Sequence, residues 1–193
     1  MNKIGLIVII FSILLIGCSS DKVTTQQNSE TKHKEEKLSK IDQIAKNMLE
    51  GDTDTTELVT DKNLPKDESD LLFNYGELNN YLDRIVENNE ISVNDNISSA
   101  ISMRIQNIIN NKVNANGKYK YLDRLIDKKI NPLLNLWHSN EVDIGMSEKD
   151  LLISCGVPIE INRTVTSNGS SEQWVYPDIY VYVENGEVTS FQD

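Results

Sequence analysis

The segment "EQWVYPDIYVYVENGEV", residues 172–188, decides the fold of the carboxyl-terminal part of this chain. Its residues alternate in character, as in a strand with one buried face. Two turn signals divide the segment, Pro177 followed by Asp178 and Asn185 followed by Gly186. An Asn-Gly pair is the strongest short signal for a β-hairpin. The segment therefore predicts antiparallel strands joined by tight turns.

Counting outward from the turns predicts the strand register. The count pairs Tyr182 with Thr189 and Tyr180 with Phe191, and residues that pair directly share a face of the sheet. The predicted core face carries Trp174, Tyr176, Ile179, Val181, Val183 and Val188. The predicted open face carries Val175, Tyr180, Tyr182, Thr189 and Phe191.

The open face is the candidate partner-binding surface. Aromatic residues such as tyrosine carry much of the binding energy in protein interfaces. Two alternatives remain, because tyrosine and threonine also favour strands for reasons of shape, and because the open face could pack against helices instead.

The residues before this segment predict one helix and one further strand. Ser147 followed by Asp150 is typical of a helix start, and Gly156 followed by Pro158 is typical of a helix end. Ile159, Ile161 and Val165 then fall on one side of a strand, and "SNGS", residues 167–170, turns the chain.

Residues 38–140 predict a helical bundle. Their apolar residues recur every three or four positions, most clearly over residues 67–88. Pro132 lies inside the last helical pattern and is expected to kink or split it near Asn131. The fold class is therefore α+β, with an amino-terminal helical bundle followed by a small helix-plus-antiparallel-sheet domain over residues 141–193.

The amino terminus resembles a bacterial lipoprotein signal. A basic start at Lys3 precedes an apolar run, which is shorter than the about 20 residues of a transmembrane helix. The run ends in "LIGC", residues 15–18, which resembles the lipobox. This resemblance implies that residues 1–17 are a signal peptide and that Cys18 is acylated. An uncleaved anchor with a chance cysteine is the alternative.

The anchor predicts where the protein works. Acylated Cys18 would hold it on the extracytoplasmic side of the cell membrane, or of the outer membrane if the host has one. Residues 18–37 are too polar to form a core, so they predict a flexible tether that spans about 25 Å.

Composition argues against several functions. The net charge is −11, so a nucleic-acid partner is not expected. His33 and His138 are too few for a histidine-based metal site, and "GDTDTTEL" from Gly51 lacks the glycine of a calcium loop. Cys155 lies among aliphatic residues and is interpreted as an inert thiol. No cofactor, metal or catalysis is expected, although one sequence cannot show a carboxylate pair.

Four short motifs in order resemble the SmpA/OmlA (BamE-like) lipoprotein family. They are Gly145-Met146-Ser147, then residues 155–158, then Trp174-Val175-Tyr176, then residues 182–188. The resemblance covers only residues 142–193, and Cys155 departs from the leucine usual in the family. It implies a non-enzymatic module that packs helices on one face of an antiparallel sheet and binds another protein.

These observations predict a protein-binding or scaffolding lipoprotein of the cell envelope, whose partner is another envelope protein. The alternative is an accessory or inhibitory lipoprotein that masks an enzyme or toxin with its open sheet face. An envelope hydrolase would require carboxylates that converge in a deep pocket.

Overall fold

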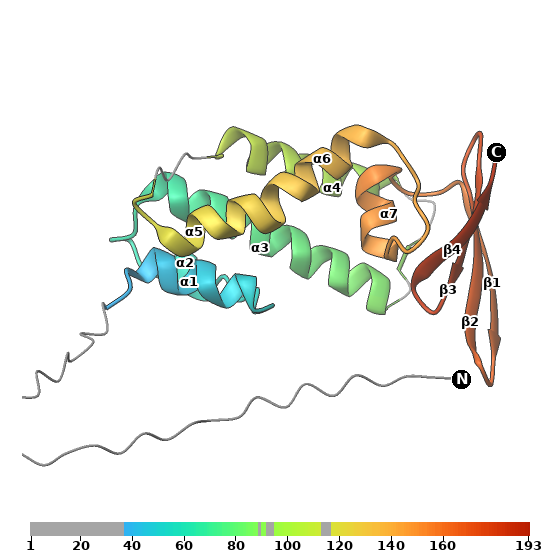
Figure 1. Cartoon of the computed structure of the whole chain (residues 1–193), viewed down its shortest axis with the longest axis horizontal. Coiled ribbons are helices and arrows are strands. Elements are labelled where there is room, and N and C mark those ends of the chain that lie inside the picture. The colour runs from blue at the N-terminus through green and yellow to red at the C-terminus, as the bar shows by residue number, and fades with distance from the viewer. Residues whose placement is uncertain (1–36, 89, 92–94, 113–116) are drawn as a thin grey trace, which may run out of the picture. The chain divides into compact units, whose positions relative to one another are not determined.

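The structure, a computed structural model, describes residues 37–88, 90–91, 95–112 and 117–193. Helices come first and a four-stranded antiparallel sheet follows, so the predicted α+β class is confirmed (Figure 1). The helices are α1 Lys40–Leu49, α2 Thr56–Thr60, α3 Lys66–Glu87, α4 Asp95–Asn110, α5 Lys120–Leu125, α6 Asn131–Ser139 and α7 Glu148–Ser154, with a π turn, η1 Ile126–Ile130, between α5 and α6. The strands are β1 Glu160–Thr166, β2 Gly169–Val175, β3 Tyr180–Glu184 and β4 Glu187–Gln192.

The interruption predicted near Asn131 is the π turn. The backbone N–H of Asn131 donates to the carbonyl of Ile126, five residues earlier, and Pro132 follows directly. Proline lacks an N–H and its ring crowds the carbonyl four residues before it. A wider turn at this point lets the chain continue from α5 through η1 into α6 without a loop.

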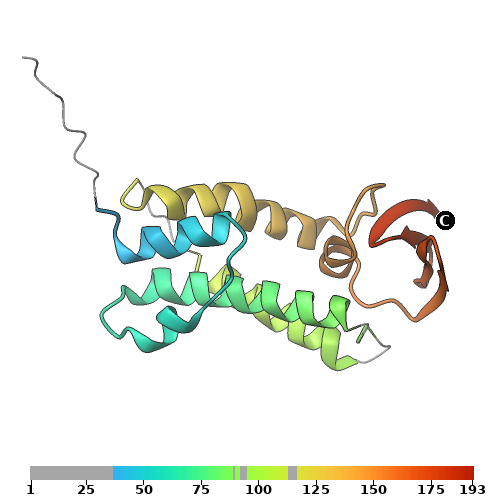
Figure 2. The same ribbon diagram turned by 90° about the horizontal axis from the view of Figure 1, so that it is seen from below.

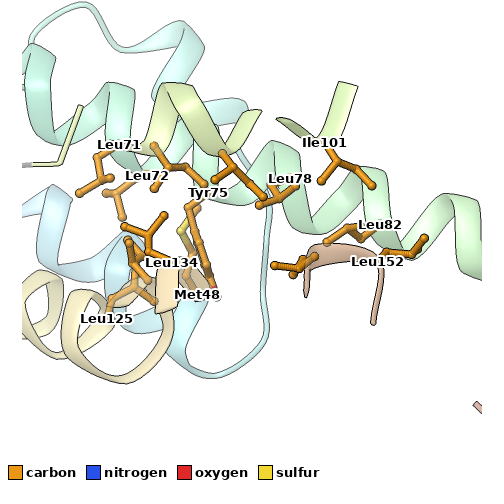
Figure 3. Packing of buried hydrophobic residues seen from close by; sticks show 14 of the residues in the cluster. Met48, Leu71, Leu72, Tyr75, Leu78, Leu82, Ile101, Leu125, Leu134 and Leu152 are labelled. Atoms are coloured by element: carbon orange, nitrogen blue, oxygen red, sulfur yellow. The ribbon is translucent and has the colours of Figure 1, made fainter. Parts of the chain in front are cut away.

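One hydrophobic core joins the helices to the sheet. Leu152 of α7 packs against Leu82 of α3 (Figure 3), and α7 also contacts α6. Lys149 of α7 forms an ion pair with Asp83 of α3. The same buried cluster continues into Trp174 of β2. Residues 37–193 therefore form one compact unit, and the domain boundary between residues 140 and 141 stays a prediction.

The local signals around α7 and the hairpins act as predicted. Ser147 and Asp150 form a capping box at the start of α7, and Gly156 follows its end with φ of 76°. Asn185 and Gly186 both have positive φ, 51° and 86°, as a two-residue type I′ turn requires. Ser167 and Asn168 turn the chain between β1 and β2.

The sheet has the order β1-β2-β3-β4 and is held to the helical region at β4. The segment before α7 pairs with the beginning of that strand: Gly145 N–H donates to the Val188 carbonyl at 2.8 Å, and Val188 N–H donates to the Met146 carbonyl at 2.8 Å. This pairing places the start of α7 directly beside the sheet.

The predicted register is correct for β2 against β3 and wrong for most of β4. Val183 pairs with Val188 as expected, but Tyr182 pairs with Ser190 and Val181 with Phe191. A β-bulge inserts one extra residue into β4 at this point, so two residues oppose one. Pairing residues one against one outward from the turn assumes a regular ladder, so it cannot detect that extra residue.

Candidate functional site

The predicted lipidation site, Cys18, lies outside the described residues, as does nearly all of the predicted tether 18–37. Among the helices that the structure describes, none is both long and apolar enough to cross a membrane.

The predicted core face of the sheet is buried. Trp174 and Val181 are completely buried, Ile179 is half-buried, and Tyr176, Val183 and Val188 keep 7% or less of their surface exposed. In Figures 1 and 2 the helices all lie on this one side of the sheet. No described helix covers the other side, called the outer face below.

Three of the five predicted partner-binding residues share the outer face. Val175 pairs with Tyr180, and Tyr182 is the next outward-facing residue along β3. Tyr180 is 46% exposed, whereas Val175 and Tyr182 are half-buried. Gln173, on the same face, donates a hydrogen bond from Nε2 to the Tyr182 hydroxyl at 3.2 Å. Asn162 of β1 donates to Gln173 Oε1 at 3.3 Å, so a chain of polar side chains crosses three strands.

The bulge moves the other two predicted residues. Phe191 pairs with Val181 and therefore belongs to the inner face, where it is 44% exposed on the edge strand. Thr189 is exposed at the bulge, and its hydroxyl donates to the Tyr182 carbonyl at 3.3 Å. The predicted placement of Phe191 on the outer face is therefore wrong, whereas the binding role of the five residues stays a prediction.

A second candidate site lies on the inner face, near the start of α7. A pocket of about 200 Å³ is lined by Ile91, Glu148, Ile161, Arg163 and Glu172. Arg163 and Glu172 pair across β1 and β2, with Arg163 Nε 2.6 Å from Glu172 Oε1. Trp174 Nε1 donates to Glu172 Oε2 at 2.7 Å. Both oxygens of the buried Glu172 carboxylate are thus held by donors.

Glu148 is in a different environment within the same pocket. Burial raises the pKa of the Glu148 carboxyl, the nearby charge of Glu172 raises it further, and Arg163 opposes both effects. An anion loses hydration when it is buried, and a neighbouring anion adds repulsion. Glu148 and Glu172 form a carboxylate pair that the sequence alone could not show.

One signal for this cluster was present in the sequence. The "SNGS" turn pairs Arg163 with Glu172, and the alternation of β2 places Glu172 on the same face as Trp174. Two charged residues on a face of apolar ones indicate a buried ion pair. Glu148 gave no such signal, because only tertiary packing brings α7 to this face.

The remaining reactive residues have structural roles. Burial raises the pKa of the half-buried Cys155 thiol, which keeps it protonated at neutral pH and agrees with an inert thiol. His138 Nδ1 lies 2.6 Å from the Leu134 carbonyl in the last turn of α6. Asp52 and Asp54 accept hydrogen bonds from nearby backbone N–H groups. In the described residues, no three His, Cys, Asp or Glu side chains gather to hold a metal ion.

Comparison of the chain with models of known protein families, with curated proteins and with solved structures finds no match. The resemblance to SmpA/OmlA proteins therefore depends on the four motifs alone.

Proposed function

We propose that this protein is a lipid-anchored lipoprotein of the extracytoplasmic cell envelope that binds another envelope protein without catalysis. In this proposal Cys18 carries the acyl anchor, residues 18–37 form the tether, and the outer face of the sheet contacts the partner. The observation that carries it is the uncovered outer face, where Val175, Tyr180 and Tyr182 lie together.

The composition of that face supports recognition of a protein. Tyrosine combines a large apolar ring with a hydroxyl at low entropic cost, which is why it is enriched in binding surfaces. Tyr182 is positioned by Gln173 and Asn162, so its ring is held in place before any partner arrives. A preformed contact surface loses less conformational entropy on binding.

The inner pocket favours binding over catalysis. A pair of catalytic carboxylates needs one group free to transfer a proton and a second free to act on substrate. Glu172 already has a donor on each oxygen. The pocket of about 200 Å³ is also below the range of about 300–1,000 Å³ typical of small-molecule sites.

The motifs shared with SmpA/OmlA proteins are a second support. They imply a module that packs helices on one face of an antiparallel sheet and binds another protein, and this chain has helices on one face of such a sheet. The helical region before residue 142 lies outside this resemblance.

Crosslinking in intact cells followed by mass spectrometry tests the proposal. We expect Tyr182→Ala and Tyr180→Ala to lose the crosslinked partner that the unaltered protein captures. Tyr121→Ala is the matched control, because Tyr121 is a half-buried tyrosine on α5, away from the sheet. The same partner yield from all three variants would contradict a binding role for the outer face. If the crosslinked partner is an enzyme that is more active with Tyr182→Ala than with the unaltered protein, that result would favour the inhibitory alternative.

A further inference from the structure

The inner pocket has a charge imbalance that the proposed function does not explain. Arg163 and Glu172 lie 2.6 Å apart and neutralise one another. Glu148 adds a second negative charge to the same pocket, which leaves the cluster of these three side chains with a net charge of one negative unit.

Glu148 is buried but has no donor of its own. Only 9% of its surface is exposed, and within the described residues no hydrogen bond or ion pair reaches its carboxylate. The same part of the chain contains no fully buried side-chain oxygen without a partner, so the Glu148 carboxylate retains a solvent-accessible side. Because Glu148 lines the pocket, that side opens into it. A nearly buried carboxylate without a donor favours binding of a cation.

The shape and lining of the pocket limit the kind of cation. A divalent metal prefers several free oxygen ligands, whereas Glu172 is already occupied and Arg163 would repel a doubly charged ion. Ile91 and Ile161 add apolar surface to the lining of the pocket. An ammonium group is a compact single charge, and the methylene stem that carries it can lie along apolar surface.

We propose that this pocket binds a primary ammonium group on a short aliphatic chain, with Glu148 as its counter-ion and Ile91 and Ile161 in contact with the chain. The ammonium restores charge neutrality to the cluster. The group could come from a lysine side chain of a protein or from a free alkyl amine, and both have the same chemistry at this site. Binding would also remove the cost of the ionised Glu148, whose pKa is raised by burial and by the nearby charge of Glu172.

The indole N–H of Trp174 provides a direct reporter, because it donates to Glu172 inside the cluster. The chain has two tryptophans, so replacing Trp137 with Phe assigns the two indole signals in a ¹⁵N-resolved NMR spectrum. Butylammonium chloride is titrated into the full chain in detergent micelles, and 1-butanol serves as the uncharged probe of similar shape.

We expect butylammonium to shift the Trp174 signal to saturation and 1-butanol to leave it unchanged. Glu148→Gln should weaken the butylammonium effect at least tenfold. Glu160→Gln should not, because Glu160 is an exposed carboxylate on the outer face of the same hairpin. Equal shifts with butanol, no saturation, or undiminished binding by Glu148→Gln would overturn the proposal. The comparison of butylammonium with butanol stands even if a variant fails to fold.

Two further probes distinguish the sources once butylammonium binds. A lysine blocked at both ends represents a protein side chain, and 1,5-diaminopentane represents a free amine. Saturation by blocked lysine at a tenfold lower concentration assigns the site to a lysine of a protein, and the reverse order assigns it to a small amine. If Tyr182→Ala loses the crosslinked partner but still binds butylammonium, the inner pocket is distinct from the proposed partner surface.

Discussion

The carboxylate of Asp42 accepts a hydrogen bond from the backbone N–H of Tyr121 and so caps helix α5, which begins far along the chain at Lys120. Its Oδ1 accepts hydrogen bonds from the backbone N–H of Tyr121 at 2.7 Å and of Leu122 at 3.3 Å. Both donors are in the first turn of α5, where N–H groups lack partners within the helix, and the flanking Tyr119 supplies no side-chain cap. Asp42 is 93% buried, so this contact joins α1 to α5 within the core.

Asp42→Ala should destabilise the protein by about 2 kcal/mol, because the change removes a cap and leaves buried N–H groups without an acceptor. Urea denaturation followed by circular dichroism measures the change. Asp67→Ala is the matched control, since Asp67 is an exposed acid in the first turn of α3, and it should cost no more than about 0.5 kcal/mol. Equal losses in the two variants would show that the tertiary cap is unimportant.

Tyr182 and Trp174 should respond differently to truncation, since they lie on opposite faces of the sheet. Trp174→Ala should cost about 3–5 kcal/mol, as large aromatic deletions from a core do. Tyr182→Ala should cost only about 1 kcal/mol, because Tyr182 is half-buried on the uncovered face. One denaturation curve for each variant gives its free energy of unfolding. Similar losses of that free energy in the two variants would place Tyr182 in the core.

Glu148 should make stability depend on pH. Its pKa is raised in the folded state, so folding favours the protonated carboxyl. The resulting stabilisation is complete below the ordinary glutamate pKa of about 4.3 and is lost as the pH rises through the raised value. We therefore expect Glu148→Gln to increase the free energy of unfolding by about 1 kcal/mol at pH 7 and to change it little at pH 4.

Urea denaturation at the two pH values measures this difference. Glu160→Gln is the control, because its carboxyl is exposed, and it should show no such dependence. A Glu148→Gln variant that is less stable than the unaltered protein at pH 7 would show that the ionised carboxylate is favourable there.

Cys18→Ala should abolish lipid attachment and leave the precursor uncut, because acylation precedes signal cleavage in the lipoproteins that this amino terminus resembles. Metabolic labelling with a fatty acid and gel mobility provide the measurement. Cys155→Ala is the control and should retain the label. Label on the Cys18 variant would exclude the proposed anchor.

The features that could be predicted from the sequence are those encoded by neighbouring residues. The capping box of Ser147 and Asp150 and the turn at Asn185 and Gly186 depend on backbone geometry within a few positions. The helical period over residues 67–88 and the alternation of β2 and β3 likewise identified the buried sides of those elements. These local signals were sufficient for the α+β class and for the core face around Trp174.

The features that could not be predicted depend on tertiary contacts or on a single extra residue. The bulge in β4 has no glycine to mark it, and it moves Phe191 to the inner face. The cap from Asp42 to Tyr121 links residues 79 positions apart. Glu148 reaches the Arg163–Glu172 pair only because α7 packs beside the sheet. One buried cluster includes residues on both sides of residue 140, which depends on the same tertiary packing.

That continuous core predicts the behaviour of the carboxyl-terminal fragment. Residues 140–193 contain α7 and the whole sheet, but Leu151 and Leu152 of α7 are fully buried within a core that the helical region shares. Exposing each such side chain costs about 1.5–3 kcal/mol, which is large beside a total stability of about 5–15 kcal/mol.

We therefore expect the fragment of residues 140–193 to melt without a cooperative transition, because a domain of about 60 residues is marginal even with its own complete core. A fragment of residues 37–193 is the control and should unfold in a single sharp transition by circular dichroism. If Leu152→Ala destabilises the longer fragment by about 2–5 kcal/mol, the lost contacts with α3 are the physical reason. A sharp melt of the shorter fragment would instead show that α7 and the sheet form an independent domain, as the four SmpA/OmlA-like motifs alone would suggest.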